Sequence, residues 1–316
     1  MKEIFKKKMI NQCKICKNSL GNENFVVREM MFGTRENFIY FRCSSCGCLQ
    51  ITESPKNMEK YYSKENYYSF QQNDINNTIA KKLKNSLYKY AFSLGLNFFL
   101  RKRVWLKLLS KEKAVKKTSS ILDVGCGVGK LLQEMNIWGF KNLTGIDPFI
   151  KKDIFYSSGV KILKQDVFNH SEKYDLIMLH HSFEHMNNPL LVLKALHKML
   201  NHKGTLLIRI PVSDSFAWRK YGSNWVQIDA PRHFFLHTTR SMTILSKEAG
   251  FVLKQIVHDS SDAQFLGSEN NCRDISSMET STHIFHTKKI KKIARQLNLM
   301  MDGDQACFIF KKNNDV

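Results

Sequence analysis

A strand, a glycine-rich turn and a helix follow one another at residues 121–138, and this unit constrains the fold most strongly. Residues 121–124 are apolar apart from Asp123, as expected of a buried strand in a parallel sheet. The turn carries three glycines at alternate positions, Gly125, Gly127 and Gly129. The amphipathic run 130–138 follows and is closed by Gly139. Such a unit forms the first crossover of a doubly wound sheet, where bare backbone lets a ligand approach closely.

Two acidic residues lie beside this turn. Asp147 ends a second predicted strand at 143–146, about 20 residues beyond the glycines, where a carboxylate accepts hydrogen bonds from ribose hydroxyls. Asp123 precedes the glycines, and the G-x-G-x-x-G phosphate spacing is absent. A carboxylate at that position repels a pyrophosphate but suits a ligand with a cationic sulfur and an ammonium group.

The motif D-x-G-x-G-x-G, which begins at Asp123, resembles that of the class I S-adenosylmethionine-dependent methyltransferases. The resemblance continues with a strand at 160–163, a strand at 174–179, a helix at 190–200 stopped by Gly204, and a strand at 205–210. It implies an α/β fold, a doubly wound Rossmann-like sheet of seven strands, with S-adenosylmethionine as cofactor. The residues expected at the cofactor are Asp123, Gly125, Cys126, Gly127, Gly129, Asp147, Pro148, Asp166, Val167, His180 and His181.

Two cysteine pairs upstream of the sheet predict a metal site. The pairs are Cys13-x-x-Cys16 and Cys43-x-x-Cys46. The β-like segments 25–27 and 38–41 between them can form a short hairpin that joins two thiolate knuckles into a tetrahedral zinc site. With all four ligands supplied by the protein, the zinc is expected to be structural. Cys48 is a spare thiol that could replace a neighbour.

Composition predicts a folded enzyme of more than one part. The 316 residues, 43% hydrophobic and 11% aromatic, suffice for one large core and a small module. We expect a zinc ribbon at 1–54, a helical linker or cap at 55–118 and a methyltransferase domain at 119–316. No signal peptide is recognised, so we expect a cytoplasmic location. In that location the eight cysteines are expected to be thiols or metal ligands and not disulfides. The longest apolar stretch, 91–100, is too short to span a bilayer.

The formal net charge of +21 favours an anionic partner or simply reflects lysines that solvate the surface. A basic amphipathic segment at 79–109 predicts a helix that covers the sheet, with peripheral membrane contact as the minority interpretation. Tyrosine pairs at 61–62 and 67–68 could line an acceptor site or pack the ribbon on the main domain.

The whole arrangement also resembles a bacterial group of methyltransferases encoded with polysaccharide and secondary-metabolite pathways. The matching segments are 180–186, 225–233 and 302–305. This resemblance implies a saccharide or nucleotide-sugar acceptor. Sugar C-methyltransferases with an amino-terminal zinc module are similar too, but they are longer, with an additional carboxy-terminal domain, so C-methylation of a keto sugar is less favoured.

Histidines in the loops after the predicted strands are the candidate catalytic bases, because imidazole titrates near neutrality. His185, next to Glu184, and His233 are the first two candidates for removing a hydroxyl proton. The alternative is a structural role, in which Glu184 and His185 orient the loop. A further alternative is that these two residues and His181 ligate a divalent metal that activates the hydroxyl, although one carboxylate with adjacent imidazoles is an incomplete ligand set. Arg232 could hold an acceptor phosphate or carboxylate.

The sequence therefore predicts O-methylation of a small polar acceptor, most simply a saccharide or nucleotide-sugar in glycan biosynthesis. An RNA methyltransferase is the main alternative, although the Asn/Asp-Pro-Pro-aromatic turn that clamps a flipped base is replaced here by residues 179–182. No cysteine nucleophile lies in the predicted active-site loops unless Cys126 is counted. A non-catalytic S-adenosylmethionine-binding protein is a further alternative, opposed by the intact glycine turn.

Overall fold

The computed structural model describes residues 11–62, 86–87, 90, 104–111, 115–279 and 287–313. The chain divides into two compact units. Unit 1 is Met1–Tyr61, Pro211–Leu245 and Ser260–Gln305, and unit 2 is Tyr62–Ile210, Ser246–Asp259 and Ala306–Val316. This division differs from the predicted domains 1–54, 55–118 and 119–316, because the chain leaves the sheet of unit 2 twice and those two excursions pack with the amino-terminal module.

Unit 2 is built on an eight-stranded sheet of order β11-β12-β9-β8-β4-β5-β7-β6. The strands are β4 (Ser120–Val124), β5 (Asn142–Ile146), β6 (Ile154–Phe155), β7 (Lys161–Leu163), β8 (Tyr174–His180), β9 (Leu200–Pro211), β11 (Phe251–His258) and β12 (Gln305–Lys312). Strands β7, β5, β4, β8 and β9 are parallel neighbours, whereas β11 pairs antiparallel with β12. The chain runs outward from β4 through β5 to β7, then returns to β8 on the other side. This reversal confirms the doubly wound α/β fold.

Two details of the predicted sheet are wrong. The sheet has eight strands instead of seven, because the tight turn at Gly159 (φ +87°) folds β6 back antiparallel onto β7. The predicted helix at 190–200 is α4 (Pro189–Met199), and Gly204 does not stop it. Leu200 is already extended (φ −82°, ψ 134°) and begins β9, so Gly204 lies within the strand.

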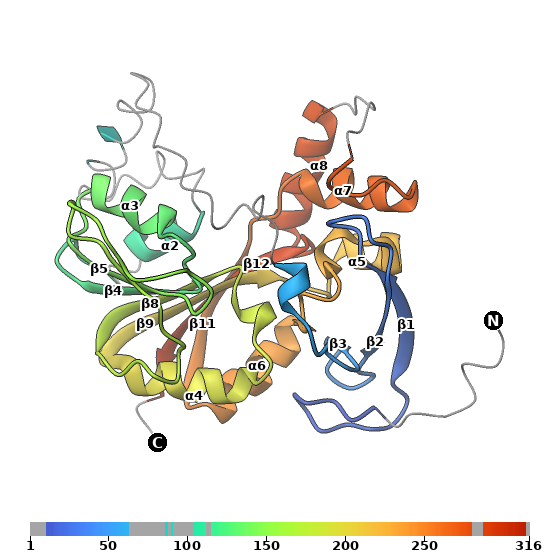
Figure 1. Cartoon of the computed structure of the whole chain (residues 1–316), viewed down its shortest axis with the longest axis horizontal. Helices are drawn as coiled ribbons and strands as arrows, with labels where there is room; N and C mark the ends of the chain where they lie inside the picture. The colour runs from blue at the N-terminus through green and yellow to red at the C-terminus, as the bar shows by residue number, and fades with distance from the viewer. Residues whose placement is uncertain are drawn as a thin grey trace. The chain divides into compact units, whose positions relative to one another are not determined.

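Helices cover both faces of this sheet (Figure 1). On one face lie α2 (Val104–Lys111) and α3 (Lys130–Ile137), with α4 on the other. Trp105 of α2 packs against Trp138, just after α3, with ring centroids 6.5 Å apart. Both tryptophans belong to a buried apolar cluster that includes Ile121, Leu176 and Leu207 of the sheet. This core holds the parallel strands in register and thereby aligns their carboxyl ends.

Unit 1 contains a four-stranded antiparallel sheet of order β1-β2-β3-β10. The strands are β1 (Glu23–Arg28), β2 (Asn37–Arg42), β3 (Leu49–Ile51) and β10 (Phe235–Leu236). The helices are α5 (Phe216–Tyr221), α7 (Ala263–Cys272) and α8 (Thr287–Leu299), together with the part of α6 (Thr239–Glu248) up to Leu245. The hairpin predicted from segments 25–27 and 38–41 is confirmed. Strand β3 extends this hairpin, and β10 pairs with β3, where Phe235 lies opposite Gln50.

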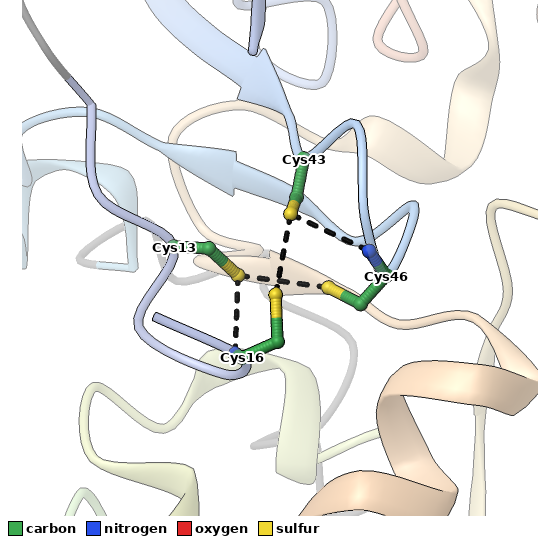
Figure 2. A group of neighbouring side chains, drawn as sticks. All are labelled: Cys13, Cys16, Cys43 and Cys46. Atoms are coloured by element: carbon green, nitrogen blue, oxygen red, sulfur yellow. Dashed lines mark hydrogen bonds between the residues drawn. The ribbon is translucent and has the colours of Figure 1, made fainter. Parts of the chain in front are cut away.

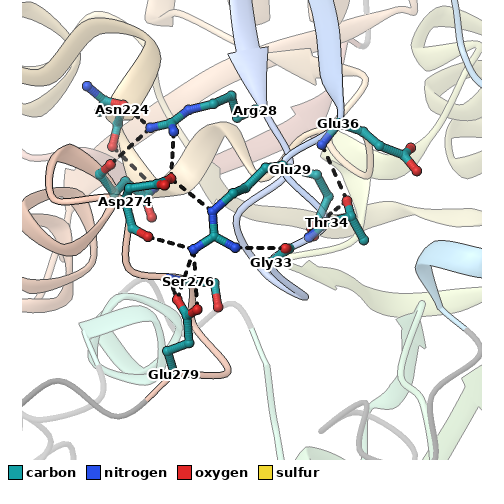
Figure 3. A network of polar contacts seen from close by, with 11 residues as sticks. Arg28, Glu29, Gly33, Thr34, Glu36, Asn224, Asp274, Ser276 and Glu279 are labelled. Carbon is teal, nitrogen blue, oxygen red and sulfur yellow. Dashed lines mark hydrogen bonds and ion pairs between the residues drawn. The ribbon is translucent and has the colours of Figure 1, made fainter.

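A polar network ties this hairpin to the segment after α7 (Figure 3). Asp274 accepts from Arg28 Nη1 at 2.6 Å and from Arg35 Nε at 3.0 Å. Arg35 also reaches Glu279 at 3.2 Å. These side chains are half-exposed, so solvent screens each pair and its contribution to stability is small. The network therefore orders the loop more than it stabilises the unit.

Part of the predicted cap lies outside the described residues. Of the predicted helix at 79–109, the described part is 86–87, 90 and 104–109, the last of which belong to α2. The tyrosine pair at 67–68 also lies outside. Within the described ranges, no helix combines the length and apolar character needed to cross a membrane.

Candidate functional site

A cavity of about 280 Å³ lies in unit 2 at the carboxyl ends of β4, β5, β7 and β8. Its lining consists of Tyr62, Val124, Gly125, Ile146, Asp147, Pro148, Phe149, Gln165, Asp166, Val167, Phe168, His181, Ser182, His185, Met186, Asn187, Asn188 and Val192. Doubly wound sheets bind their ligands at this edge, where the strand order reverses. The volume is near the lower end of that of small-molecule sites.

The glycine turn closes one wall of the cavity. Gly125 has φ +74°, and a Cβ there would lie 2.5 Å from Cβ of Ser182. Ser182 in turn donates to the carbonyl of Val124 at 2.7 Å. Only glycine therefore permits the loop after β8 to approach the end of β4 this closely. Gly129 instead faces Ile162, whose side chain would lie 2.3 Å from an added Cβ, so it serves close packing behind the turn.

Asp147 organises a second wall, directly beside the glycine turn. Its carboxylate is buried and accepts backbone N–H groups from Gly127 at 2.8 Å and from Phe149 at 2.9 Å. The two oxygens each use one lone pair in these bonds and each retains a second. A carboxylate of this kind, in a cavity wall, can accept hydrogen bonds from two ribose hydroxyls, so its free acceptor positions fit the nucleoside of S-adenosylmethionine.

Asp123 lies behind the cavity lining. Burial, followed by the nearby charge of Asp147, raises the pKa of Asp123 to about 8. Burial also raises the pKa of Asp147. Because two carboxylates share this region, a cationic ligand would favour their ionised forms. Cys126, whose pKa burial raises well above its usual value, packs with its sulfur against Gly145.

The third wall follows β7. Asp166 and Val167, two of the residues expected at the cofactor, line the cavity, and Asp166 accepts the backbone N–H of Phe168 at 2.8 Å. Sequence reasoning missed Phe149 and Phe168, two largely exposed aromatic side chains at the cavity. Their positions could have predicted them, because each lies two residues after an acidic residue that was expected at the cofactor.

The adjacent histidines at the end of β8 diverge. The ring of His180 meets Trp105 edge-on at 4.9 Å, toward α2, and is not part of the cavity lining. His181, with φ +53°, lines the cavity. Its Nε2 lies 2.8 Å from Nη1 of Arg209, which is itself paired with Asp259 at 2.7 Å. Since a guanidinium only donates, Nε2 accepts and the proton of neutral His181 is on Nδ1, 3.5 Å from Glu184.

Of the three predicted catalytic residues, His185 lines the cavity. Its Nδ1 lies 3.2 Å from the hydroxyl of Tyr62, whose ring stacks on Phe149 with centroids 5.7 Å apart. Glu184 is fully buried beside His181, which is the geometry of a loop-orienting residue. His233 belongs to unit 1, where its Nδ1 lies 2.7 Å from the carbonyl of Gln227.

Arg232 does not offer its charge to a ligand as the sequence suggested. The side chain is fully buried in unit 1 and forms a two-point pair with Asp229. It also lies 3.5 Å from Glu29 and stacks over Phe32. Because these groups surround its guanidinium, Arg232 stabilises the loop in which it lies.

The four predicted metal ligands converge in unit 1 (Figure 2). All four sulfur atoms of Cys13, Cys16, Cys43 and Cys46 lie within 4.8 Å of one another. Two of the separations are 3.6 Å (Cys13 to Cys46) and 3.4 Å (Cys16 to Cys43). A tetrahedral zinc with 2.3 Å bonds has sulfurs about 3.8 Å apart, so the cluster fits that ion.

Backbone and side-chain donors support the same cluster. The N–H groups of Cys16 and Cys46 point to the sulfur atoms of Cys13 and Cys43 at 3.5 and 3.4 Å. Gln50, buried in β3, donates to Cys13 at 2.9 Å. Such donors stabilise thiolate charge around a metal. Cys48 is buried elsewhere, 3.9 Å from Nδ1 of His237, and is not part of the cluster.

Comparisons with known proteins place a methyltransferase domain in this chain. A family model described as a methyltransferase domain matches residues 99–256. The tRNA U34 carboxymethyltransferase of Helicobacter pylori (strain HPAG1) is 32% identical over 123 residues, which cover 34% of this chain and 46% of that protein. The (S)-coclaurine N-methyltransferase of Thalictrum flavum subsp. glaucum is 25% identical over 159 residues, covering 47% and 43%. The chain thus spans less than half the length of these curated relatives.

Among solved structures, a SAM-dependent methyltransferase from Archaeoglobus fulgidus is similar with a TM-score of 0.41 and 16% identity, covering 74% of this chain and all (100%) of that one. The fold and the matched domain together define the class, and the chain belongs to the methyltransferase domain family. Its parallel, doubly wound strands have the arrangement expected of the class I S-adenosylmethionine-dependent enzymes, with one additional strand, β6.

Proposed function

We propose that this chain binds S-adenosylmethionine in the cavity of unit 2 and methylates a hydroxyl of a small polar acceptor, with a saccharide or nucleotide-sugar as the favoured class. The observation that carries the proposal is the cavity at the strand ends, with Asp147 and Asp166 in its wall and His185 in its lining. When bound, the cofactor would supply an activated methyl group on a cationic sulfur.

Three carboxylates have separable roles in this proposal. Asp147 holds the ribose hydroxyls, because it lies buried in the wall with its oxygens fixed by two backbone bonds. Asp166 binds the adenine amino group. Asp123 contributes negative charge from behind the lining, which favours a cationic ligand over a phosphate.

His185 removes the acceptor proton in this mechanism. If its Nδ1–H donates to the Tyr62 hydroxyl, 3.2 Å away, Nε2 becomes the basic nitrogen. Tyr62 is then a positioning residue that selects the tautomer of the base. Transfer of the methyl group from the sulfonium would convert the acceptor hydroxyl to an ether and leave the cofactor as its neutral thioether, while His185 would take the hydroxyl proton. The rest of the catalysis comes from alignment of acceptor and methyl group.

His181 is not a base in this arrangement. Its Nε2 already accepts a hydrogen bond from Arg209, so that lone pair is not free to take the proton of an acceptor hydroxyl. The series Asp259, Arg209, His181 and Glu184 instead links β11, β9 and the loop after β8. We propose that this series holds the loop so that His185 faces the cavity.

The cysteine cluster is proposed to bind one structural zinc. Its four thiolates leave no position for substrate. The small sheet of unit 1 gains order from such an ion, because short ribbons have little core of their own.

RNA methylation is the second candidate function. It is favoured by the net charge of +21 and by the match to a protein named as a tRNA U34 carboxymethyltransferase. The decisive experiment incubates the protein with radiolabelled S-adenosylmethionine and three acceptor pools: sugar nucleotides, a glycan extract and bulk tRNA.

The proposal expects the radioactive methyl group in a sugar nucleotide or glycan. A label that survives acid treatment but is removed by hydrogen iodide supports an O-methyl ether. Label in tRNA alone would refute the saccharide proposal. Label retained after hydrogen iodide treatment would indicate C-methylation of a sugar. Absence of cofactor binding in calorimetry would refute enzymatic function altogether.

A further inference from the structure

Helix α8 presents a strongly cationic face. Within Thr287–Leu299 the charged residues are all basic, and all are exposed: Lys288, Lys289, Lys291, Lys292 and Arg295. Lys288, Lys292 and Arg295 follow at intervals of four and three residues, so they form one line along the helix. The spacing places Leu299 four residues further on in the same line.

The opposite face of α8 packs inward. Ala294 and Leu297 are buried, and Ile290 and Ile293 are half-buried. The hydrophobic stripe of this amphipathic helix is therefore already used by the fold. Lys291 lies 3.8 Å from Asp262 but remains more than half exposed. The cationic line is consequently available for an external partner.

An apolar tip ends the cationic line. Leu299, Met300 and Met301 have exposed fractions of 86%, 71% and 53%. The backbone holds them in place, since the N–H of Met300 donates to Gln296 and that of Asp302 donates to Leu297. Three consecutive exposed apolar side chains at an ordered helix end are unusual for a surface that faces only water.

We propose that the outer face and tip of α8 dock on an anionic lipid bilayer. Lysines and arginine at the phosphate level gain electrostatic energy from acidic headgroups, and adjacent apolar side chains gain from entering the interface. RNA would reward the cations but not an aliphatic tip, because it is bound by stacking and phosphate contacts. The combination of charge and tip therefore favours lipid.

The test measures sedimentation of the full chain with vesicles of phosphatidylcholine, alone or mixed with phosphatidylglycerol. Binding is expected with the acidic vesicles and should weaken with salt. Each cation at an anionic surface contributes about fivefold, so the triple variant Lys288→Gln, Lys292→Gln, Arg295→Gln should bind about a hundredfold more weakly.

The matched control replaces three other exposed lysines, Lys151, Lys152 and Lys194, by glutamine. It removes the same charge and should keep nearly full binding. Leu299→Ser with Met300→Ser should weaken binding while leaving its salt dependence intact. Circular dichroism of each variant checks folding. Equal losses in the control, equal binding to neutral vesicles, or a triple variant that loses tRNA binding but keeps vesicle binding would each overturn the proposal.

Discussion

Replacement of Asp147 by asparagine tests the cofactor site most directly. In the structure its two oxygens accept the N–H groups of Gly127 and Phe149 at 2.8 and 2.9 Å. Asparagine keeps one acceptor oxygen and replaces the other by an NH₂ group, so one of the two charged oxygens proposed to accept from the ribose hydroxyls is lost. A hydrogen bond to a charged group is worth about 1.5–3 kcal/mol. We therefore expect Asp147→Asn to weaken S-adenosylmethionine binding by about 10- to 150-fold.

Isothermal titration calorimetry at fixed pH measures this loss. The matched control is Asp153→Asn, because Asp153 also accepts a backbone N–H, that of Lys164 at 2.7 Å, but is exposed and does not line the cavity. The control should bind the cofactor normally. Equal affinities of wild-type protein and Asp147→Asn would refute the assigned role of this carboxylate.

Four further predictions concern the other sites. Burial raises the pKa of Asp123 to about 8 from an ordinary value near 3.8, so between these pH values the folded protein binds one proton more than the unfolded chain. Without ligand, the free energy of unfolding should therefore fall as pH rises through that window, by up to about 1.4 kcal/mol per pH unit. Thermal melts of Asp123→Asn should show a flatter dependence on pH. His185→Ala should lower turnover about 10²- to 10⁴-fold at unchanged cofactor affinity. Tyr62→Phe should lower kcat less and shift the pH dependence of kcat, because Tyr62 contacts Nδ1 of His185. Full activity of both variants would show that His185 is not the base and that solvent takes the proton. Metal analysis should find about one zinc per chain, lost in Cys43→Ser/Cys46→Ser but kept in the exposed-thiol control Cys272→Ser; zinc retained in the double variant would disprove the assignment. Arg232→Met leaves Asp229 and Glu29 without their buried cation and should lower the free energy of unfolding in urea by about 3–5 kcal/mol. The control Arg219→Met, which breaks an exposed ion pair with Asp302, should lower it by less than about 1 kcal/mol. Similar losses in the two variants would argue against a stabilising role of the buried pair.

Much of unit 2 could be predicted because its signals are local. A buried parallel strand is apolar over successive residues, as at 121–124 apart from Asp123, and a turn that needs positive φ selects glycine, as at Gly125. The acidic residues Asp147 and Asp166 follow strands directly, so strand prediction alone brought them to one edge of the sheet. The cysteine knuckles are local as well, and the hairpin between them joins the two pairs.

The remaining features depend on contacts between distant segments. Strand β10 is two residues long and exists because Phe235 and Leu236 pair with β3, nearly two hundred positions earlier in the chain. Arg232, which was predicted to hold an acceptor anion, is instead buried because the fold brings Glu29 and Asp229 next to its guanidinium. The sequence alone determined the doubly wound sheet, its glycine turn and the order of its acidic residues, since each has a local steric or electrostatic cause. Only the tertiary structure decided which histidine meets Tyr62, which arginine is buried and which segments join the ribbon, because those outcomes follow from packing between residues far apart in sequence.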